Sequence, residues 1–224
     1  VEGLLNKDAI NKMFKRLKKN GGEFSFRKVQ GKSKKVYEAN ITLFNAFQKT
    51  DTDPKGKYHY ARYLCAHAIM ISFEGIPAIY FNSLFGKSND EAKYVITGNN
   101  RDVNRYKWNY KNITKKLSDN KTKQSIFYHN IVNLLSIRRK QKAFHPSGIR
   151  HNINLGPKLF CFKRESIDKK QSIICITNLS SKNQNAKLSK SLSNYKDLLN
   201  SKTKFKNENL LTLRPFQTVW LSNI

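Results

Sequence analysis

The sequence predicts an α/β fold followed by a small antiparallel β domain, and two observations support this. Residues 58–73 have a helical, Ala-containing pattern that leads directly into the short apolar run 78–81. A helix followed by a strand that is buried on both faces is the unit that builds parallel sheets. From about residue 150 the pattern changes to short β-rich segments separated by Ser, Asn and Lys. We therefore expect an α/β part at residues 1–149 and an all-β domain at residues 150–224.

The chain begins with a predicted amphipathic helix. Asn6 is a favourable N-cap residue, and Gly21 and Gly22 end the pattern. Apolar residues recur between them at the helical spacing i, i+3, i+4 and i+7, namely Ile10, Met13, Phe14 and Leu17.

The next segment, residues 23–35, is irregular in pattern and strongly basic. Its basic residues surround Gly31 and are Arg27, Lys28, Lys32, Lys34 and Lys35. Two interpretations are open: a solvated loop, or a lid that contacts an anion through Lys and Arg side chains. Tyr37 and Glu38 follow this segment, and we consider them candidate ligand contacts.

The central segment contains the best candidate site. Gly75 and Pro77 interrupt the preceding helical pattern, and the β-favouring run 78–81 then predicts a buried parallel strand. A polar loop follows, which contains the sequence NNRDVNR at Asn99–Arg105. Because loops at the carboxyl ends of parallel strands bind ligands in barrels and open α/β sheets, we expect the site there.

The remaining elements follow in order. Residues 113–119 are weakly helical, and residues 121–143 predict a long helix whose basic last turn suits the helix dipole. Residues 159–162, 172–176 and 211–221 predict strands, with 219–221 in the last one.

The composition is basic, with 43 Lys and Arg against 15 Asp and Glu and a formal net charge of +28. The charges lie in every segment rather than along one face, and no zinc-finger, RNP or homeodomain pattern occurs. Nucleic-acid binding is therefore disfavoured, although it remains an alternative.

The cysteine pattern predicts a protein of a reducing compartment, and the histidine pattern predicts no metal site. Cys65, Cys161 and Cys175 lie in apolar segments, which predicts buried thiols in a cytoplasmic protein. The His residues lack metal-ligand spacing. No apolar run approaches the roughly twenty residues of a membrane span, so we expect no membrane partner.

Several sequence blocks together resemble the alpha-amylase family of glycoside hydrolases, in its sucrose phosphorylase branch. The blocks are EGIPAIY at Glu74–Tyr80, GNNRDVNR at Gly98–Arg105, LSIRRKQKAFHP at Leu135–Pro146 and YEAN at Tyr37–Asn40. The resemblance covers nearly the whole chain. It is greatest to the glucosylglycerate phosphorylases, on the segment GGEFSF at Gly21–Phe26.

This resemblance implies that the chain forms the C-terminal quarter of a (β/α)8 barrel and a β-sandwich-like domain. It assigns residues 21–40 to an acceptor loop and residues 82–112 to a substrate loop. Arg101 is implied to contact the glucosyl group, and the pair Tyr37 and Glu38 is implied to contact the acceptor. Because Glu38 stands where the family has Gln, an acceptor such as glycerate or glycerol is favoured over sucrose.

The loop residues beside Arg101 are expected to have a structural role. Asp102 and Arg105 are expected to form a salt bridge, and Asn104 is expected to help shape the loop.

The resemblance also implies a reaction. A retaining phosphorylase transfers an α-glucosyl group through a covalent intermediate that inorganic phosphate then attacks, and it needs phosphate as co-substrate but no cofactor. No carboxylate of this chain stands in a matching catalytic motif. We expect the nucleophile, the acid/base and the third Asp to precede Val1, so the chain alone should not catalyse.

Other functions are also open. An amylase-type hydrolase or transglycosidase would use water or a sugar in place of phosphate. A carbohydrate-binding role could use Trp108 and Trp220 for stacking. The oligomeric state is not predicted.

Overall fold

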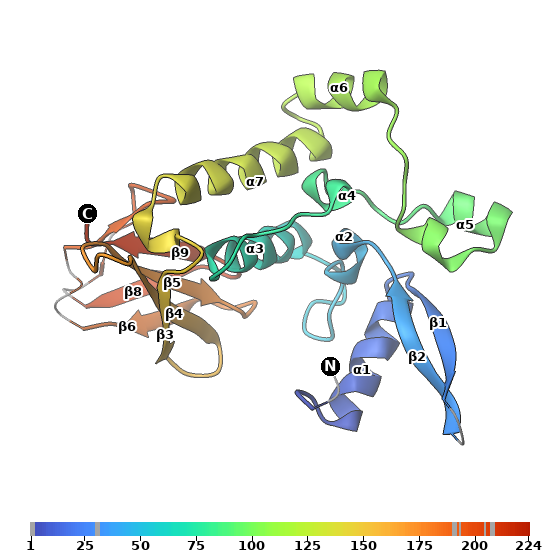
Figure 1. The fold of residues 1–224 in the computed structure, drawn as a ribbon, viewed down its shortest axis with the longest axis horizontal. Helices are drawn as coiled ribbons and strands as arrows, with labels where there is room; N and C mark the ends of the chain where they lie inside the picture. Colours follow the sequence, from blue (N-terminus) through green and yellow to red (C-terminus); the bar gives the residue numbers. More distant parts are fainter. Residues whose placement is uncertain (1–2, 30–31, 190–191, 193, 204, 207–208) are drawn as a thin grey trace. The chain divides into compact units, whose positions relative to one another are not determined.

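The computed structural model describes residues 3–29, 32–189, 192, 194–203, 205–206 and 209–224. Gly31, at the centre of the predicted lid, and Val1 lie outside the described residues. The chain divides into two compact units. Unit 1 comprises Val1–His59 and Ile79–Tyr128, and unit 2 comprises Tyr60–Ala78 and His129–Ile224 (Figure 1). The predicted division between residues 149 and 150 stays a prediction.

Unit 1 contains short helices and one antiparallel hairpin. Its elements are α1 (Lys7–Lys19), β1 (Glu23–Val29), β2 (Lys32–Asn40), α2 (Leu43–Ala46), α4 (Phe81–Leu84), α5 (Glu91–Thr97), η1 (Asn100–Val103), α6 (Tyr110–Ser118) and the start of α7 (Lys123–Arg139).

The first helix is confirmed. The Asn6 side chain accepts a hydrogen bond from the Ala9 N–H at 2.8 Å and so caps α1. Although α1 has the predicted apolar stripe, none of its residues is fully buried. Phe14 packs edge-to-face on Phe24 of β1, with ring centroids 5.4 Å apart.

The interpretation of residues 23–35 as an irregular loop is wrong. β1 and β2 form an antiparallel hairpin in which Glu23 pairs with Asn40 and Ser25 with Glu38. The signal was the alternation of Phe24, Ser25 and Phe26, which the many Lys residues of the segment obscured.

The predicted parallel strand at residues 78–81 is also not observed. Residues 76–80 have no regular structure and Phe81 begins α4. All strand pairs of the described residues are antiparallel. A buried parallel strand needs hydrogen-bonded neighbours, and no described segment supplies one.

Unit 2 contains α3 (His59–Ser72) from Tyr60 onward, most of α7, and the C-terminal β sheets; α3 and α7 confirm the predicted helices. The C-terminal elements are η2 (Lys142–Phe144), β3 (Ile149–Asn154), β4 (Leu159–Glu165), β5 (Ser172–Asn178), β6 (Gln184–Lys187), β7 (Lys196–Asp197), β8 (Leu210–Leu213) and β9 (Thr218–Ser222).

The predicted antiparallel β region is confirmed. One sheet has the strand order β3-β4-β5-β9-β7, and a second consists of β6 and β8. Side chains from both sheets, including Ile176, Leu213 and Leu221, share one buried apolar cluster. Trp220 of β9 is fully buried and contacts Phe144 with ring centroids 4.9 Å apart.

Two buried arginines bind the carboxyl end of α3. Arg164, which is fully buried, donates to the carbonyl oxygens of Ser72 at 3.1 Å and His145 at 2.7 Å. Arg138 donates to the carbonyls of Ile71, Phe73 and Gly75. These guanidinium groups satisfy carbonyls that a helix end leaves without intrahelical partners.

The cysteines are buried free thiols, as predicted. Burial raises the pKa of Cys65 and of Cys161 to about 12, and it also raises the pKa of Cys175. Among the described residues, no helix is long and apolar enough to cross a membrane.

Candidate functional site

The two predicted site segments meet within unit 1. Arg101 Nε donates a hydrogen bond to Glu38 Oε2 at 3.0 Å, which joins η1 to β2 across 63 residues of sequence. The side chains are 46% and 31% exposed, so the pair is open to solvent on one side. Among the described residues, the terminal amino groups of Arg101 form no hydrogen bond or ion pair, so they remain able to donate to a ligand.

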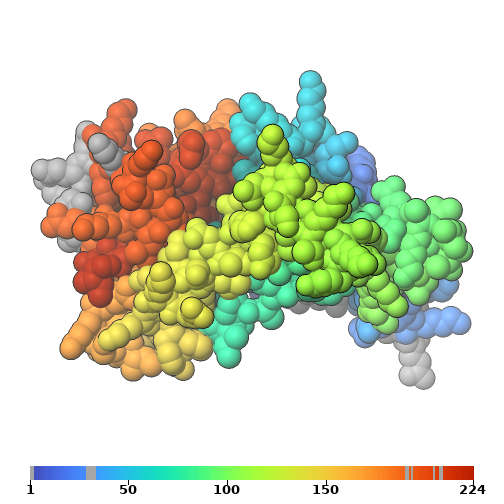
Figure 2. Space-filling model, turned by 90° about the horizontal axis from the view of Figure 1, so that it is seen from above, coloured from blue at the N-terminus to red at the C-terminus, as the bar shows by residue number. Residues whose placement is uncertain are grey.

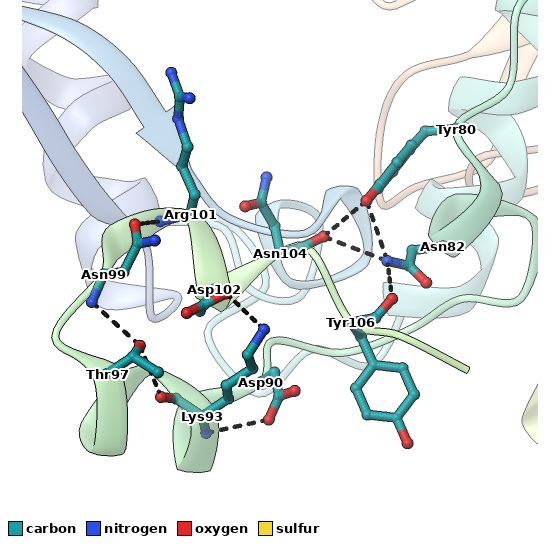
Figure 3. A network of polar contacts seen from close by, with 10 residues as sticks. All are labelled: Tyr80, Asn82, Asp90, Lys93, Thr97, Asn99, Arg101, Asp102, Asn104 and Tyr106. Atoms are coloured by element: carbon teal, nitrogen blue, oxygen red, sulfur yellow. Dashed lines mark hydrogen bonds and ion pairs between the residues drawn. The ribbon is translucent and has the colours of Figure 1, made fainter. Parts of the chain in front are cut away.

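Local capping places Arg101. Asp90 caps α5 by accepting from the Lys93 N–H at 3.3 Å, and Gly98 ends that helix in the left-handed conformation at φ 62°. Asn99 then caps η1, because its side chain accepts from the Arg101 N–H at 3.1 Å. Figure 3 shows Arg101 directed away from the polar contacts at the base of the loop.

Asp102 shapes the loop through a different partner from the one predicted. Its carboxylate pairs with Lys93 Nζ at 2.6 Å, and the hydrogen bond from Lys93 lowers the pKa of Asp102. Arg105 is exposed and does not form the expected pair. The ion pair therefore ties η1 back to α5 within the same loop.

A second link joins the loop to the hairpin. Asn100 Nδ2 donates to the Phe24 carbonyl at 3.0 Å and to Ser25 Oγ at 3.3 Å. Asn40 donates to the same Ser25 oxygen at 3.1 Å. Since Ser25 is opposite Glu38 in the hairpin, η1 contacts both strands of one cross-strand pair.

Tyr37 precedes Glu38 in β2 and is 60% exposed. It lines a groove of about 980 Å³ between α1 and the hairpin, together with Arg27 and Lys35 and apolar side chains of α1. Two of the basic residues of the predicted lid thus face a groove. Contact with an anion stays a prediction.

Asn82 was not identified from the sequence. This buried side chain of α4 accepts a hydrogen bond from Trp108 Nε1 at 2.8 Å and donates to the Tyr106 carbonyl at 3.1 Å. Asn104, predicted to shape the loop, takes part through its carbonyl. The available signal was an Asn within the apolar run YFNSLF, where a buried amide needs several partners.

The two tryptophans that were considered for sugar stacking differ in burial. Trp220 is fully buried and so is excluded from sugar stacking, whereas Trp108 is partly buried between Phe85 and Tyr106. No cluster of three or more His, Cys, Asp or Glu able to hold a metal occurs in the described part of the chain. The arrangement offers one guanidinium and one carboxylate, which suit hydroxyl or carboxylate recognition.

Sequence comparison finds relatives of this chain among the glycoside phosphorylases. No family model matches it. It is 30% identical over 223 residues to glucosylglycerate phosphorylase of Escherichia coli (strain K12), which covers 99% of this chain and 38% of that protein. It is also 30% identical over 112 residues to sucrose phosphorylase of Agrobacterium vitis, covering 50% of this chain and 20% of that protein. The chain thus spans less than two fifths of these relatives' length.

Structural comparison shows the fold. Sucrose 6F-phosphate phosphorylase from Thermoanaerobacter thermosaccharolyticum superposes with a TM-score of 0.62 at 20% identity, over 79% of this chain and 33% of that chain. The structural neighbours are alpha-amylase-family enzymes, so the α/β fold class is confirmed.

Proposed function

We propose that this chain, a homologue of the glucosylglycerate and sucrose phosphorylases, forms the acceptor side of a retaining glycoside phosphorylase. Such an enzyme exchanges an α-glucosyl group between inorganic phosphate and a small acceptor. In this proposal the region from α3 to α7 belongs to the last part of a (β/α)8 barrel.

The observation that carries the proposal is the ion pair between Arg101 and Glu38. The implied sugar-binding arginine and the implied acceptor residue come from separate segments, yet they meet at 3.0 Å. One nitrogen of the guanidinium binds Glu38, and its terminal amino groups are left for sugar hydroxyls or for a carboxylate. The pair therefore holds one donor group and one acceptor group at the meeting point of two substrates.

The charges of this pair favour a small polar acceptor. Glu38 compensates part of the Arg101 charge. Arg27 and Lys35 line the groove between α1 and the hairpin, and neither Glu38 nor Arg101 is among the lining residues of that groove. An acceptor with hydroxyl groups can bond to both members of the pair, and the carboxylate of an acceptor such as glycerate can accept from the guanidinium. We assign no nucleophile or acid/base to this chain.

An assay of the complete gene product tests the proposed reaction. It is incubated with glucose 1-phosphate and, separately, glycerate, glycerol or fructose, and phosphate release is measured. Acceptor-dependent release supports the phosphorylase and identifies its acceptor. Release of free glucose without acceptor dependence supports the hydrolase instead, and a folded product without any turnover overturns the proposal.

Variants of the ion pair test the assigned roles. Arg101→Lys keeps the charge but loses the planar fork, and Glu38→Gln removes the carboxylate charge, so each should lower kcat/KM about tenfold. Glu23→Gln is the matched control, because Glu23 lies on the same hairpin and pairs with Lys18 at 2.5 Å. Equal loss of activity in the control and the pair variants would contradict the assignment.

A further inference from the structure

We propose that Asn82 is a positioning residue. It fixes the segment that follows η1, residues 104–109, which we call the returning segment, and it thereby holds Arg101 beside Glu38. This inference rests on the proposed phosphorylase function for its kinetic consequence, whereas its structural consequence is independent of that function. Asn82 is 3% exposed and lies at the start of the loop, in α4.

The contacts of Asn82 converge on the segment that follows η1. Its Nδ2 donates to the carbonyls of Tyr106 at 3.1 Å and Asn104 at 3.4 Å, and it lies 3.2 Å from the Tyr80 hydroxyl (Figure 3). The Tyr80 hydroxyl itself donates to the Asn104 carbonyl at 3.3 Å. Trp108 Nε1 donates to Asn82 Oδ1 at 2.8 Å. One side chain thus contacts three positions of the returning segment.

The chemistry of these partners requires an amide. Carbonyl oxygens accept only, and the indole N–H donates only, so the side chain must present N–H groups on one side and an oxygen on the other. Asn82 satisfies both demands in a single orientation. An Asp would lose the donors, and an apolar residue would lose every contact.

The returning segment depends on such support because it makes few regular contacts. Residues 105–109 belong to no helix or strand, so no ladder of backbone bonds fixes them. Aromatic packing adds to the Asn82 contacts: Tyr106 and Trp108 meet at 4.9 Å, and Lys87 Nζ lies 4.0 Å from the Tyr106 ring centroid. Asn104 directly follows η1, so anchoring its carbonyl fixes the end of the helix that carries Arg101.

The chain contains a matched control for this role. Asn178 in unit 2 is fully buried, and its Nδ2 donates to the carbonyls of Lys182, Leu213 and Arg214 at 2.8, 3.2 and 2.9 Å. It has the same chemistry as Asn82, but all its partners lie in the β region. A general cost of losing a buried amide should therefore appear in both variants, whereas loop positioning should depend on Asn82 alone.

The experiment compares Asn82→Ala, Asn82→Asp and Asn178→Ala in the complete gene product. Hydrogen exchange by mass spectrometry reports on residues 99–108, and 5-fluorotryptophan NMR reports on Trp108, whose resonance is assigned with Trp108→Phe. KM for glucose 1-phosphate and kcat are measured in parallel.

Asn82→Ala should speed exchange across residues 99–108, shift the Trp108 resonance and raise KM between about tenfold and a hundredfold, as expected for a misplaced binding group. Asn82→Asp should keep the Trp108 resonance, since the acceptor oxygen remains, while exchange near Asn104 rises. Asn178→Ala should change neither the loop exchange nor KM.

Unchanged loop exchange and an unchanged Trp108 resonance in Asn82→Ala would overturn the inference. So would a loosened loop with a KM no higher than that of Asn178→Ala, and that result would leave the phosphorylase proposal intact. If the unsubstituted protein has no phosphorylase activity, the exchange and NMR measurements decide whether Asn82 fixes the loop, while the proposed function fails separately.

Discussion

The β region of unit 2 and the loops of unit 1 are stabilised by different kinds of contact. In unit 2 the side chains of Ile173, Ile176 and Trp220 are fully buried within the sheet. In unit 1, α1 and α5 bury no residue completely, and side-chain amides such as Asn82 and Asn100 bind backbone carbonyls instead. Figure 2 shows one face of the molecule in a space-filling view coloured by residue number.

The difference separates stability from site geometry. Apolar burial contributes most of the free energy of folding but is not directional, whereas hydrogen bonds contribute little net energy and fix geometry. We therefore expect substitutions in unit 2 to lower stability strongly. Substitutions in the exposed loops of unit 1 should disturb the candidate site with small changes in stability.

The largest expected effect is that of Trp220→Ala. Loss of a fully buried indole should lower the free energy of unfolding by about 4 kcal/mol. The half-buried Phe14 of α1 is the comparison, and Phe14→Ala should cost clearly less. Urea titration followed by circular dichroism measures both. Equal losses would contradict the contrast between the two units.

Arginine offers a test with one residue type in both regions. Arg164→Met should lower the free energy of unfolding by about 2 kcal/mol, because buried carbonyls of Ser72 and His145 lose their donor. Arg101→Met removes an exposed side chain and should cost less than about 0.5 kcal/mol. A larger stability loss at Arg101 than at Arg164 would reverse the comparison.

The pH dependence of unit 2 provides a third test. Burial lowers the pKa of His67 in α3 below its usual 6.5. The unfolded chain therefore binds this proton more readily, and the stabilising contribution is complete above about pH 6.5 and is lost as the pH falls toward the folded pKa. The slope should not exceed about 1.4 kcal/mol per pH unit. His67→Leu should remove this slope from chemical denaturation between pH 7 and about 5, and an unchanged slope would exclude His67 as its source.

The smallest expected change in stability is that of Glu38→Gln. The ion pair with Arg101 is half-exposed, so its loss should change the free energy of unfolding by less than about 0.5 kcal/mol. Its kinetic effect should nevertheless exceed that of Trp220→Ala measured where both proteins are folded. A stability loss as large as that of Arg164→Met would show that the pair belongs to the core of unit 1.

The sequence predicted elements whose determinants are local. Asn6 and the stripe that follows define α1 within one short segment, and the C-terminal strands carry their own β-favouring runs. The prediction of a strand at residues 78–81 was wrong because a parallel strand depends on partner strands that are distant in the sequence. The β1–β2 hairpin was missed because cross-strand pairing, rather than composition, defines it.

The contacts of the candidate site also join segments that are distant in the sequence, so the sequence alone did not predict them. The resemblance singled out Arg101 and Glu38 separately, and no local pattern could show that they pair, because 63 residues separate them. Asp102 was expected to bind Arg105 nearby but binds Lys93, in the first turn of α5. Asn82 was missed because its importance lies in four partners that only the folded loop brings together.

The three cysteines of the chain can report on the opening of one unit. Cys65, Cys161 and Cys175 all lie in unit 2, and their burial keeps them protonated and shielded from reagents. Alkylation of these thiols under native conditions therefore requires unit 2 to open. Opening that is confined to the loops of unit 1 exposes no cysteine and so causes no alkylation. The rate of alkylation therefore measures how often unit 2 opens, and the measurement needs no introduced probe.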